Sequence, residues 1–157
     1  MAIENNMIKL YDDIDFCSRY KDIATKYKVE NRDNRLKKID KKKVLEIFDS
    51  LGYEAIFNTK ESFYKVRIIK FEYDFYFHVD IRSGLYELIF GVICKDSKKH
   101  IGGVIADVYD DILRVKQIEE ESMSLPSFSN YEELESMLKE SLSLFVDFKV
   151  GVLKLKP

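Results

Sequence analysis

Residues 53–94 constrain the fold of this chain more than any other segment, because they are dense in β-branched and aromatic residues and are interrupted by short polar turns. Alternation of apolar and polar residues predicts strands over 63–71 and 73–81, since successive side chains of a strand point to opposite faces. In the second of these strands the odd-numbered positions are apolar and the even-numbered positions are mostly polar. This pattern is typical of an antiparallel sheet with one face in water and helices covering the other.

A third predicted strand, Leu85–Cys94, is apolar on both faces, which predicts a central position in the sheet with partial cover on each side. Ile69 breaks the alternation of the first strand and indicates either a bulge or a second buried contact. Polar segments at 58–61, 82–84 and 96–99 are suited to the turns. The segment therefore predicts an antiparallel meander of four to five strands.

Two helices are predicted before the strands. Apolar residues at helical spacing indicate a helix over 12–28, and residues 1–9 are expected to be loose or a short edge element. Asp40 is suited to cap a second helix over 41–51, which Gly52 ends in a left-handed conformation.

The chain after the strands is more mixed. The two glycines of 100–103 predict a sharp change of direction. Residues 104–114 predict a helix, and a strand over 103–108 is the alternative. Residues 116–125 are acidic and polar and predict a loop or a short strand.

The last helix is the clearest element outside the sheet. Ser129 and Glu132 have the spacing of a capping box, in which the serine bonds a helical amide and the glutamate reaches back. Apolar residues then recur at spacings of three and four, which predicts a helix lying across the sheet rather than one leg of a coiled coil. The stripe consists of Tyr131, Leu134, Leu138, Leu142, Phe145 and Phe148. Residues 150–157 are expected to be a fraying tail.

Together these elements predict an α+β fold in which an antiparallel β meander packs against N-terminal helices and a long C-terminal helix. The length of 157 residues predicts one domain. Hydrophobic residues make up 46% of the chain and charged residues 34%, which indicates a globular rather than a disordered protein.

Charge and composition also narrow the function. The net charge of -2 argues against a general nucleic-acid binder. No signal peptide and no apolar run of membrane-spanning length is found, so we expect a cytoplasmic protein with no membrane partner. Cys17 and Cys94 are far apart in sequence, and Cys94 is expected to be a small buried apolar residue rather than half of a disulfide.

Candidate catalytic groups are few. Asp107, Asp110 and Asp111 lie at helical spacing, and neighbouring carboxylates can bind Mg²⁺ or act as acid and base. A solvated acidic helix face is the ordinary explanation for such residues. His78 and His100 have no metal-ligand spacing with either cysteine. The sequence therefore predicts no enzymatic activity, no catalytic residue, no metal and no cofactor.

The charge layout is more informative. Between Arg19 and Lys43 there are eleven Lys or Arg and four Asp or Glu, which indicates a solvated helix surface or a weak patch for phosphate or an acidic partner. Between Asp107 and Glu140 there are ten Asp or Glu and three basic residues. Such an acidic half is either a random surface excess or a complement to a basic partner, whose capture it would speed. The predicted partner-binding residues are Asp107, Asp110, Asp111, Glu119, Glu120, Glu121, Glu132 and Glu133.

These features resemble the small cytosolic immunity proteins of bacterial toxin systems, such as contact-dependent inhibition and related polymorphic toxins. The resemblance is carried by the meander over 64–94, the turn 101–103 and the closing helix over 128–149, and it covers residues 44–149. It implies a protein that binds one cognate toxin tightly and blocks its active site, for example that of a nuclease with a basic substrate cleft. Two other classes remain open: a secretion or folding chaperone that holds an unfolded segment at the sheet edge, and an adaptor domain of a larger assembly.

Overall fold

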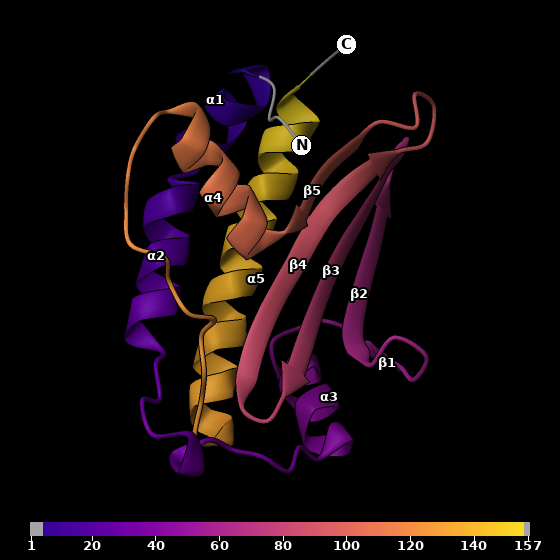
Figure 1. Cartoon of the computed structure of the whole chain (residues 1–157). Helices are drawn as coiled ribbons and strands as arrows, with labels where there is room; N and C mark the ends of the chain where they lie inside the picture. The colour runs from indigo at the N-terminus through magenta and orange to yellow at the C-terminus, as the bar shows by residue number, and fades with distance from the viewer. Residues whose placement is uncertain (1–4, 156–157) are drawn as a thin grey trace.

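Helices gather on one face of a single antiparallel sheet in the computed structural model, which describes residues 5–155 (Figure 1). The strands lie in the order β1-β2-β3-β4-β5, so each strand pairs with its neighbours in sequence. The strands are β1 (Ile56–Asn58), β2 (Phe63–Lys70), β3 (Tyr73–Arg82), β4 (Leu85–Cys94) and β5 (His100–Val104). The helices are α1 (Asn5–Asp13), α2 (Phe16–Lys26), the 3-10 turn η1 (Arg32–Asn34), α3 (Lys41–Ser50), α4 (Ile105–Val115) and α5 (Tyr131–Lys154). The predicted α+β meander with N-terminal helices and a long C-terminal helix is confirmed.

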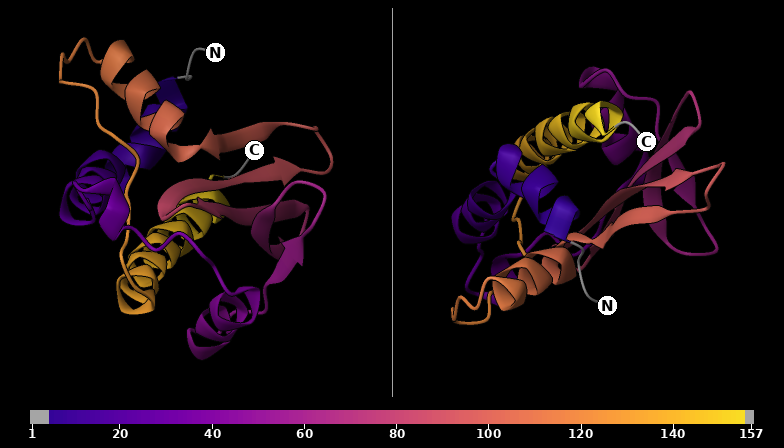
Figure 2. Two further views of the ribbon diagram at one scale, coloured as in Figure 1. Left: turned by 60° about the horizontal axis from the view of Figure 1, so that its bottom comes forward. Right: turned by 90° about the horizontal axis from the view of Figure 1, so that it is seen from above.

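The inner face of the sheet is the apolar face that the alternation predicts. In β3, Phe75, Phe77 and Val79 have no exposed surface, and Phe77 lies in register between Val66 of β2 and Phe90 of β4. The two views in Figure 2 show α5 and the other helices on this side of the sheet, and no described helix covers the opposite face. We call that opposite side the outer face.

Helix α5 closes the core. The ring centroid of Phe145 lies 5.4 Å from that of Phe77, 5.5 Å from that of Phe90 and 6.5 Å from that of Phe75. The predicted stripe is confirmed, and it continues to Val152, which is 1% exposed. The expectation of a fraying tail is therefore wrong for 150–154, because α1 packs against this turn; residues 156–157 lie outside the described residues.

Asn130, rather than Ser129, is the N-cap of α5. Its side chain accepts a hydrogen bond from the Glu133 N–H at 2.8 Å. Glu133 Oε1 in turn accepts from the N–H and the hydroxyl of Ser129, at 2.7 and 2.8 Å. The predicted pairing of Ser129 with Glu132 is wrong by one residue, because asparagine caps as well as serine and Glu133 then has the right spacing to reach back.

The segment 12–28, which we predicted to be one helix, contains the end of α1 and all of α2. The chain breaks at Asp15, which adopts a left-handed φ of 57°, and α1 covers most of the segment that we expected to be loose. Burial of Leu10, which is 4% exposed, accounts for the formation of α1. No helix-breaking residue marks the turn after α1 in the sequence. Residues 1–4 of the expected loose segment lie outside the described residues. In contrast, α3 has the predicted cap and stop: Asp40 accepts from the Lys42 N–H at 3.0 Å, and Gly52 has a φ of 89°.

Residues 100–104 form the edge strand β5, where the glycines had predicted a change of direction. Gly102 lies opposite Gly91 of β4, and the Tyr76 side chain of β3 covers Gly91 on the outer face. A Cβ on Gly91 would stand 2.6 Å from the Tyr76 hydroxyl and 2.4 Å from the carbonyl oxygen of Ile101. A Cβ on Gly102 would stand 2.4 Å from the carbonyl oxygen of Phe90. The two glycines thus allow close packing within a strand pair.

Helix α4 begins at Ile105, directly after β5, which confirms the predicted helix over 104–114 and not the alternative strand. The chain then runs without regular structure to α5, as the loop alternative for 116–125 predicted. Near its end this connection is held to the start of β4: the Tyr86 N–H donates to the Pro126 carbonyl at 2.9 Å, and the Phe128 N–H donates to that of Gly84 at 3.0 Å.

One expectation about the sheet is wrong and another is confirmed in part. Ile69 pairs regularly with Asp74 and is 52% exposed, so it marks neither a bulge nor a buried contact. Strand β4 is an internal strand with partial burial on both faces, as predicted, although β3 and not β4 is the middle strand of the sheet. The apolar outer side of β4 has no helix over it among the described residues, and Ile93 there is 42% exposed.

Candidate functional site

Six of the eight predicted partner-binding carboxylates lie on α4 and the loop that follows it. An open groove of about 550 Å³ lies at the C-terminal end of α4. We call it the acidic groove; its lining residues are Asp110, Leu113, Arg114, Gln117, Ile118, Glu119 and Glu120. Glu121 lines an adjoining groove of about 450 Å³, which also contains Glu120 and Lys21. The structure therefore brings Asp110, Glu119, Glu120 and Glu121 together at the two grooves, and Asp107 and Asp111 lie on the same helix as Asp110.

Three basic residues near the acidic groove are already engaged within the chain. Arg114 pairs with Asp111 at 2.7 Å, Lys116 pairs with Asp12 at 2.5 Å, and Lys21 pairs with Glu120 at 3.2 Å. By contrast, no described residue forms a hydrogen bond or ion pair with the side chains of the other four carboxylates, which are exposed. These four are Asp107, Asp110, Glu119 and Glu121. The uncompensated charge of this surface is therefore negative.

Glu120 has a fixed position in this surface. The Tyr109 hydroxyl donates to it at 2.6 Å, and the Lys21 ammonium donates at 3.2 Å. These two donors, the tyrosine first, hold the pKa of Glu120 below its usual value, so it stays charged near neutral pH. Burial, and then the bond to Glu120, raise the pKa of Tyr109.

Apolar side chains stand among these carboxylates. Ile118 is 46% exposed and lines the acidic groove, and Val115, one turn earlier, is 42% exposed. An apolar centre with a charged rim is the usual composition of a protein–protein interface. The scaffold beneath is rigid, because Ile105, Val108 and Ile112 anchor α4 to the core.

Glu132 and Glu133 are not part of this surface. They lie in the first turn of α5, at the opposite end of the molecule from the start of α1 and the top of α4 (Figure 1). Glu133 is also occupied by the N-cap bonds to Ser129. The predicted set of eight carboxylates thus divides into a group of six and a separate pair.

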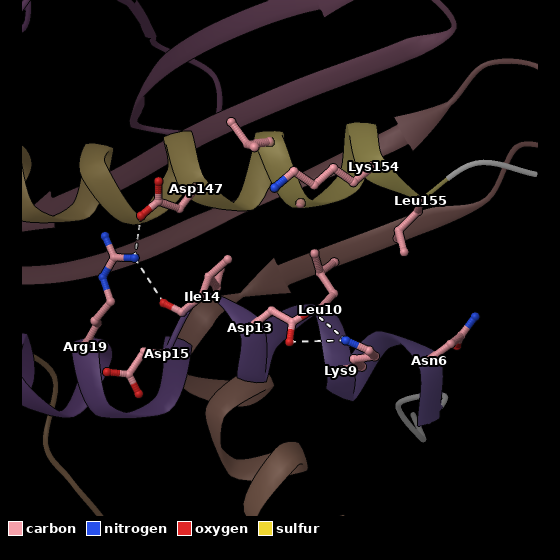
Figure 3. A pocket seen from close by; sticks show the side chains of 12 residues that line it. Asn6, Lys9, Leu10, Asp13, Ile14, Asp15, Arg19, Asp147, Lys154 and Leu155 are labelled. Atoms are coloured by element: carbon pink, nitrogen blue, oxygen red, sulfur yellow. Dashed lines mark hydrogen bonds and ion pairs between the residues drawn. The ribbon is translucent and has the colours of Figure 1, made fainter.

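The predicted basic surface of 19–43 is partly neutralised inside the molecule. Arg19 pairs with Asp147 at 2.7 Å, Lys26 with Glu140 at 2.7 Å, and Lys21 with Glu120. The first of these pairs lines a groove of about 640 Å³ between α1, α2 and the end of α5 (Figure 3). In that groove Arg19 also donates to the Ile14 carbonyl at 3.0 Å, and Lys9 pairs with Asp13 at 3.0 Å. Arg19 thus links α2 to α5, whereas Lys9 and Asp13 pair within α1.

Sequence reasoning missed a second cluster, on the outer face. His78 and His100 are far apart in sequence, but both contact Tyr76: its hydroxyl lies 2.5 Å from Nε2 of His100, and its ring centroid is 5.1 Å from that of His78. Phe63 stacks on His78 with centroids 4.2 Å apart. A shallow pocket of about 330 Å³ lies beside these rings, next to Lys65. Correct strand register would have revealed the cluster, because the rings share one face of β2, β3 and β5.

We expect His78 to make stability depend on pH. Burial, and then the nearby Lys65 ammonium, lower the pKa of His78 from 6.5 to about 4. Between these two values the unfolded chain binds more protons than the folded protein, so the free energy of unfolding should fall as the pH drops from about 6.5 towards about 4. The substitution His78→Phe keeps a ring against Phe63 and should remove this part of the slope.

Urea unfolding at a series of pH values tests this expectation. The imidazole is neutral in both states above about pH 8, so the difference between the variant and the parent protein should be constant there and should change mainly below about pH 7. Equal slopes for the two proteins between pH 6.5 and 4 would contradict the assignment. Nε2 of His78 is buried and has no hydrogen-bond partner among the described residues. Replacing this nitrogen by a carbon in His78→Phe therefore leaves no partner group without its hydrogen bond.

The cysteines, the candidate metal ligands and the helices can also be compared with the sequence predictions within the described residues. Cys17 and Cys94 are both free and half-buried. No group of three or more His, Cys, Asp or Glu residues within 5–155 is arranged to hold a metal ion. None of the described helices combines the length and apolar character needed to cross a membrane.

Comparison with known proteins adds no relative to this geometry. No protein-family model, no curated protein and no solved structure matches the chain.

Proposed function

We propose that this protein is an immunity protein, which binds a cognate bacterial toxin through the acidic groove and blocks its active site. One observation carries the proposal: four exposed carboxylates without intrachain partners and two exposed apolar side chains, Val115 and Ile118, lie on α4 and the loop that directly follows it, and α4 is anchored in the core. The resemblance of the chain to small immunity proteins supports the same function. A toxin with a basic substrate cleft, such as a nuclease, has the complementary charge.

Each part of the surface has a distinct role in this proposal. The unpaired carboxylates attract a basic partner and raise its association rate, an effect that salt weakens. The apolar pair loses water on contact and slows dissociation. Because α4 is packed on the sheet before the toxin arrives, little conformational entropy is lost on binding. Occlusion needs no chemistry from this chain.

Charge reversal tests the proposal. The variant Asp110→Lys/Glu119→Lys/Glu121→Lys changes only carboxylates without intrachain partners, so its fold should be retained. At low salt, the rate of association with the toxin should fall by roughly tenfold or more, and the difference should shrink in high salt. The partner to be tested is any product of an adjacent gene that arrests growth when it is expressed alone. Stopped-flow binding and a growth assay with both proteins give the two measurements.

A matched control carries the same charge change elsewhere. Glu46→Lys/Glu61→Lys/Glu135→Lys alters three exposed residues on α3, the β1–β2 loop and the exposed side of α5. This control should capture the toxin at nearly the parental rate. Equal loss in both variants would mean that net charge alone matters, and no loss in either would place the interface elsewhere. If no adjacent gene product is toxic, or none binds, the immunity proposal fails.

A further inference from the structure

Strand β2 has an edge that is only partly covered. It is eight residues long, but β1 pairs with only three of them, 63–65. Residues 66–70 pair with β3 on one side, and on the other side no strand within 5–155 lies against them. Figure 1 shows this upper half of β2 at the margin of the sheet, above the short β1 and α3. Every second residue of such a stretch directs its backbone N–H and C=O outward, where they can pair with another strand.

The side chains at this edge are unusually exposed. Ile69 is 52% exposed, and Phe71, in the turn that follows, is 77% exposed, the highest value among the large apolar residues described as exposed. Natural sheets usually shield an open edge with charge, proline or a covering loop, because an apolar edge invites pairing. Here two large apolar side chains stand beside the open backbone. The combination is typical of an edge that receives a strand from a partner.

Uncompensated positive charge adjoins the same edge. Arg67 is neutralised by Asp74, to which it donates two hydrogen bonds of 2.9 and 2.7 Å. Lys70 and Lys149 of α5 form no ion pair with any described residue. Burial, and then the charge of Lys70, lower the pKa of Lys149, so the two ammonium groups are close enough to repel each other. A carboxylate placed between them would relieve this repulsion.

We propose that residues 66–71 form a second binding surface, which takes up an extended, acidic segment of a partner polypeptide as an additional strand. Apolar side chains on one side of that segment would lie next to Ile69 on the outer face. On the other side, an acidic side chain would lie next to Lys70, and uncharged side chains would lie next to Val66 and Ile68, which share the inward side of β2 with Lys70. The segment would therefore alternate apolar residues with acidic and uncharged polar ones.

Charge argues against a second copy of this chain as the occupant. The β2 edge carries more positive than negative charge without an ion pair among the described residues, with Lys65, Lys70 and Lys149 against Glu72, so pairing of two such edges would bring like charges together. The surface formed by 66–71 is also separate from the acidic groove, because α4 adjoins β4 and β5, near the opposite edge of the sheet. The inference therefore goes beyond the proposed toxin binding and does not depend on it.

Capped peptides of known sequence test the proposal. The probe is an eight-residue peptide in which valine alternates with glutamate and threonine, and the matched probe has lysine in place of each glutamate. Titrated into the ¹⁵N-labelled protein up to about 1 mM, the glutamate peptide should shift and protect the backbone amides of 66–71. It should bind at least about tenfold more tightly than the lysine peptide. Lys70→Glu, a change at an exposed position, should reverse this preference.

Several outcomes would overturn the proposal. These are the absence of shifts at the highest concentration, shifts located away from 66–71, and equal binding of the two peptides. A dimer of the free protein that Ile69→Lys dissociates would show that the edge serves a second copy instead. The triple variant of the acidic groove should bind the glutamate peptide like the parent protein, so failure of this surface is distinguishable from failure of the toxin-binding proposal.

Discussion

Replacing Phe145 by alanine is expected to lower the free energy of unfolding by about 3–5 kcal/mol, the usual cost of removing a buried phenylalanine ring. Phe145 has no exposed surface, and its ring contacts the rings of Phe75, Phe77 and Phe90 on three positions of the inner face. These partners belong to β3 and β4, so they cannot follow the helix to fill the cavity without disturbing the sheet. Urea unfolding followed by circular dichroism measures the change.

A control on the same helix separates this effect from helix propensity. Val150 of α5 is 46% exposed, and Val150→Ala should change the free energy of unfolding by no more than about 0.5 kcal/mol. If Phe145→Ala cost no more than this control, α5 would not be packed on the sheet in the way described. If the alanine variant were unfolded without denaturant, Phe145→Leu should restore the fold with a smaller loss, because it leaves a smaller cavity.

The second large effect is expected at the hydrogen bond between Tyr86 and Ser141. The Tyr86 hydroxyl donates to Ser141 Oγ at 2.8 Å, and the two residues are 1% and 0% exposed. Ser141→Ala would leave the buried hydroxyl without its acceptor, so the free energy of unfolding should fall by about 1–3 kcal/mol. The measurement is again urea unfolding, at a pH near 7 where tyrosine is neutral.

The double variant makes this expectation specific. Adding Tyr86→Phe to Ser141→Ala removes the unpaired hydroxyl, so part of the lost stability should return. The four proteins form a double-mutant cycle, whose interaction energy should be clearly different from zero. Strictly additive losses would mean that the two side chains contribute independently to the free energy of unfolding and that the hydrogen bond between them contributes nothing of its own.

The sheet was predictable because local chemistry and tertiary packing agree there. The predicted bounds of Leu85–Cys94 match β4, since a polar turn lies at each of its ends. The prediction and the structure differ where burial alone decides the local structure. Nothing in the sequence marks the break at Asp15, and two adjacent glycines look like a turn until Tyr76 is known to cover the strand pair. The environment of Ile69 could not be predicted from the sequence, because the open edge of the sheet leaves this apolar side chain exposed to water.

The candidate site was predictable only in part, for a different reason. A count of charges along the chain finds the acidic half, but it cannot tell which carboxylates meet a lysine or arginine in the fold. Lys21 and Lys26 of the basic run are used to hold Glu120 and Glu140, more than 95 residues away in sequence. The cluster of His78, Tyr76 and His100 depends on strand register, which periodicity does not determine.

The close contact between Gly91 and Gly102 has a consequence for the position of the acidic groove. A slip of β5 by two residues would place His100 or Val104 opposite Gly91, where a Cβ at the position of Gly102 would meet the backbone of Phe90 and Gly91. Steric contact with the backbone therefore opposes a slip of β5 by two residues. Since α4 follows β5 without a loop, a slip would also move the helix by about 7 Å along the sheet. The two glycines thus determine where the carboxylates of α4 are presented, although neither glycine belongs to that surface.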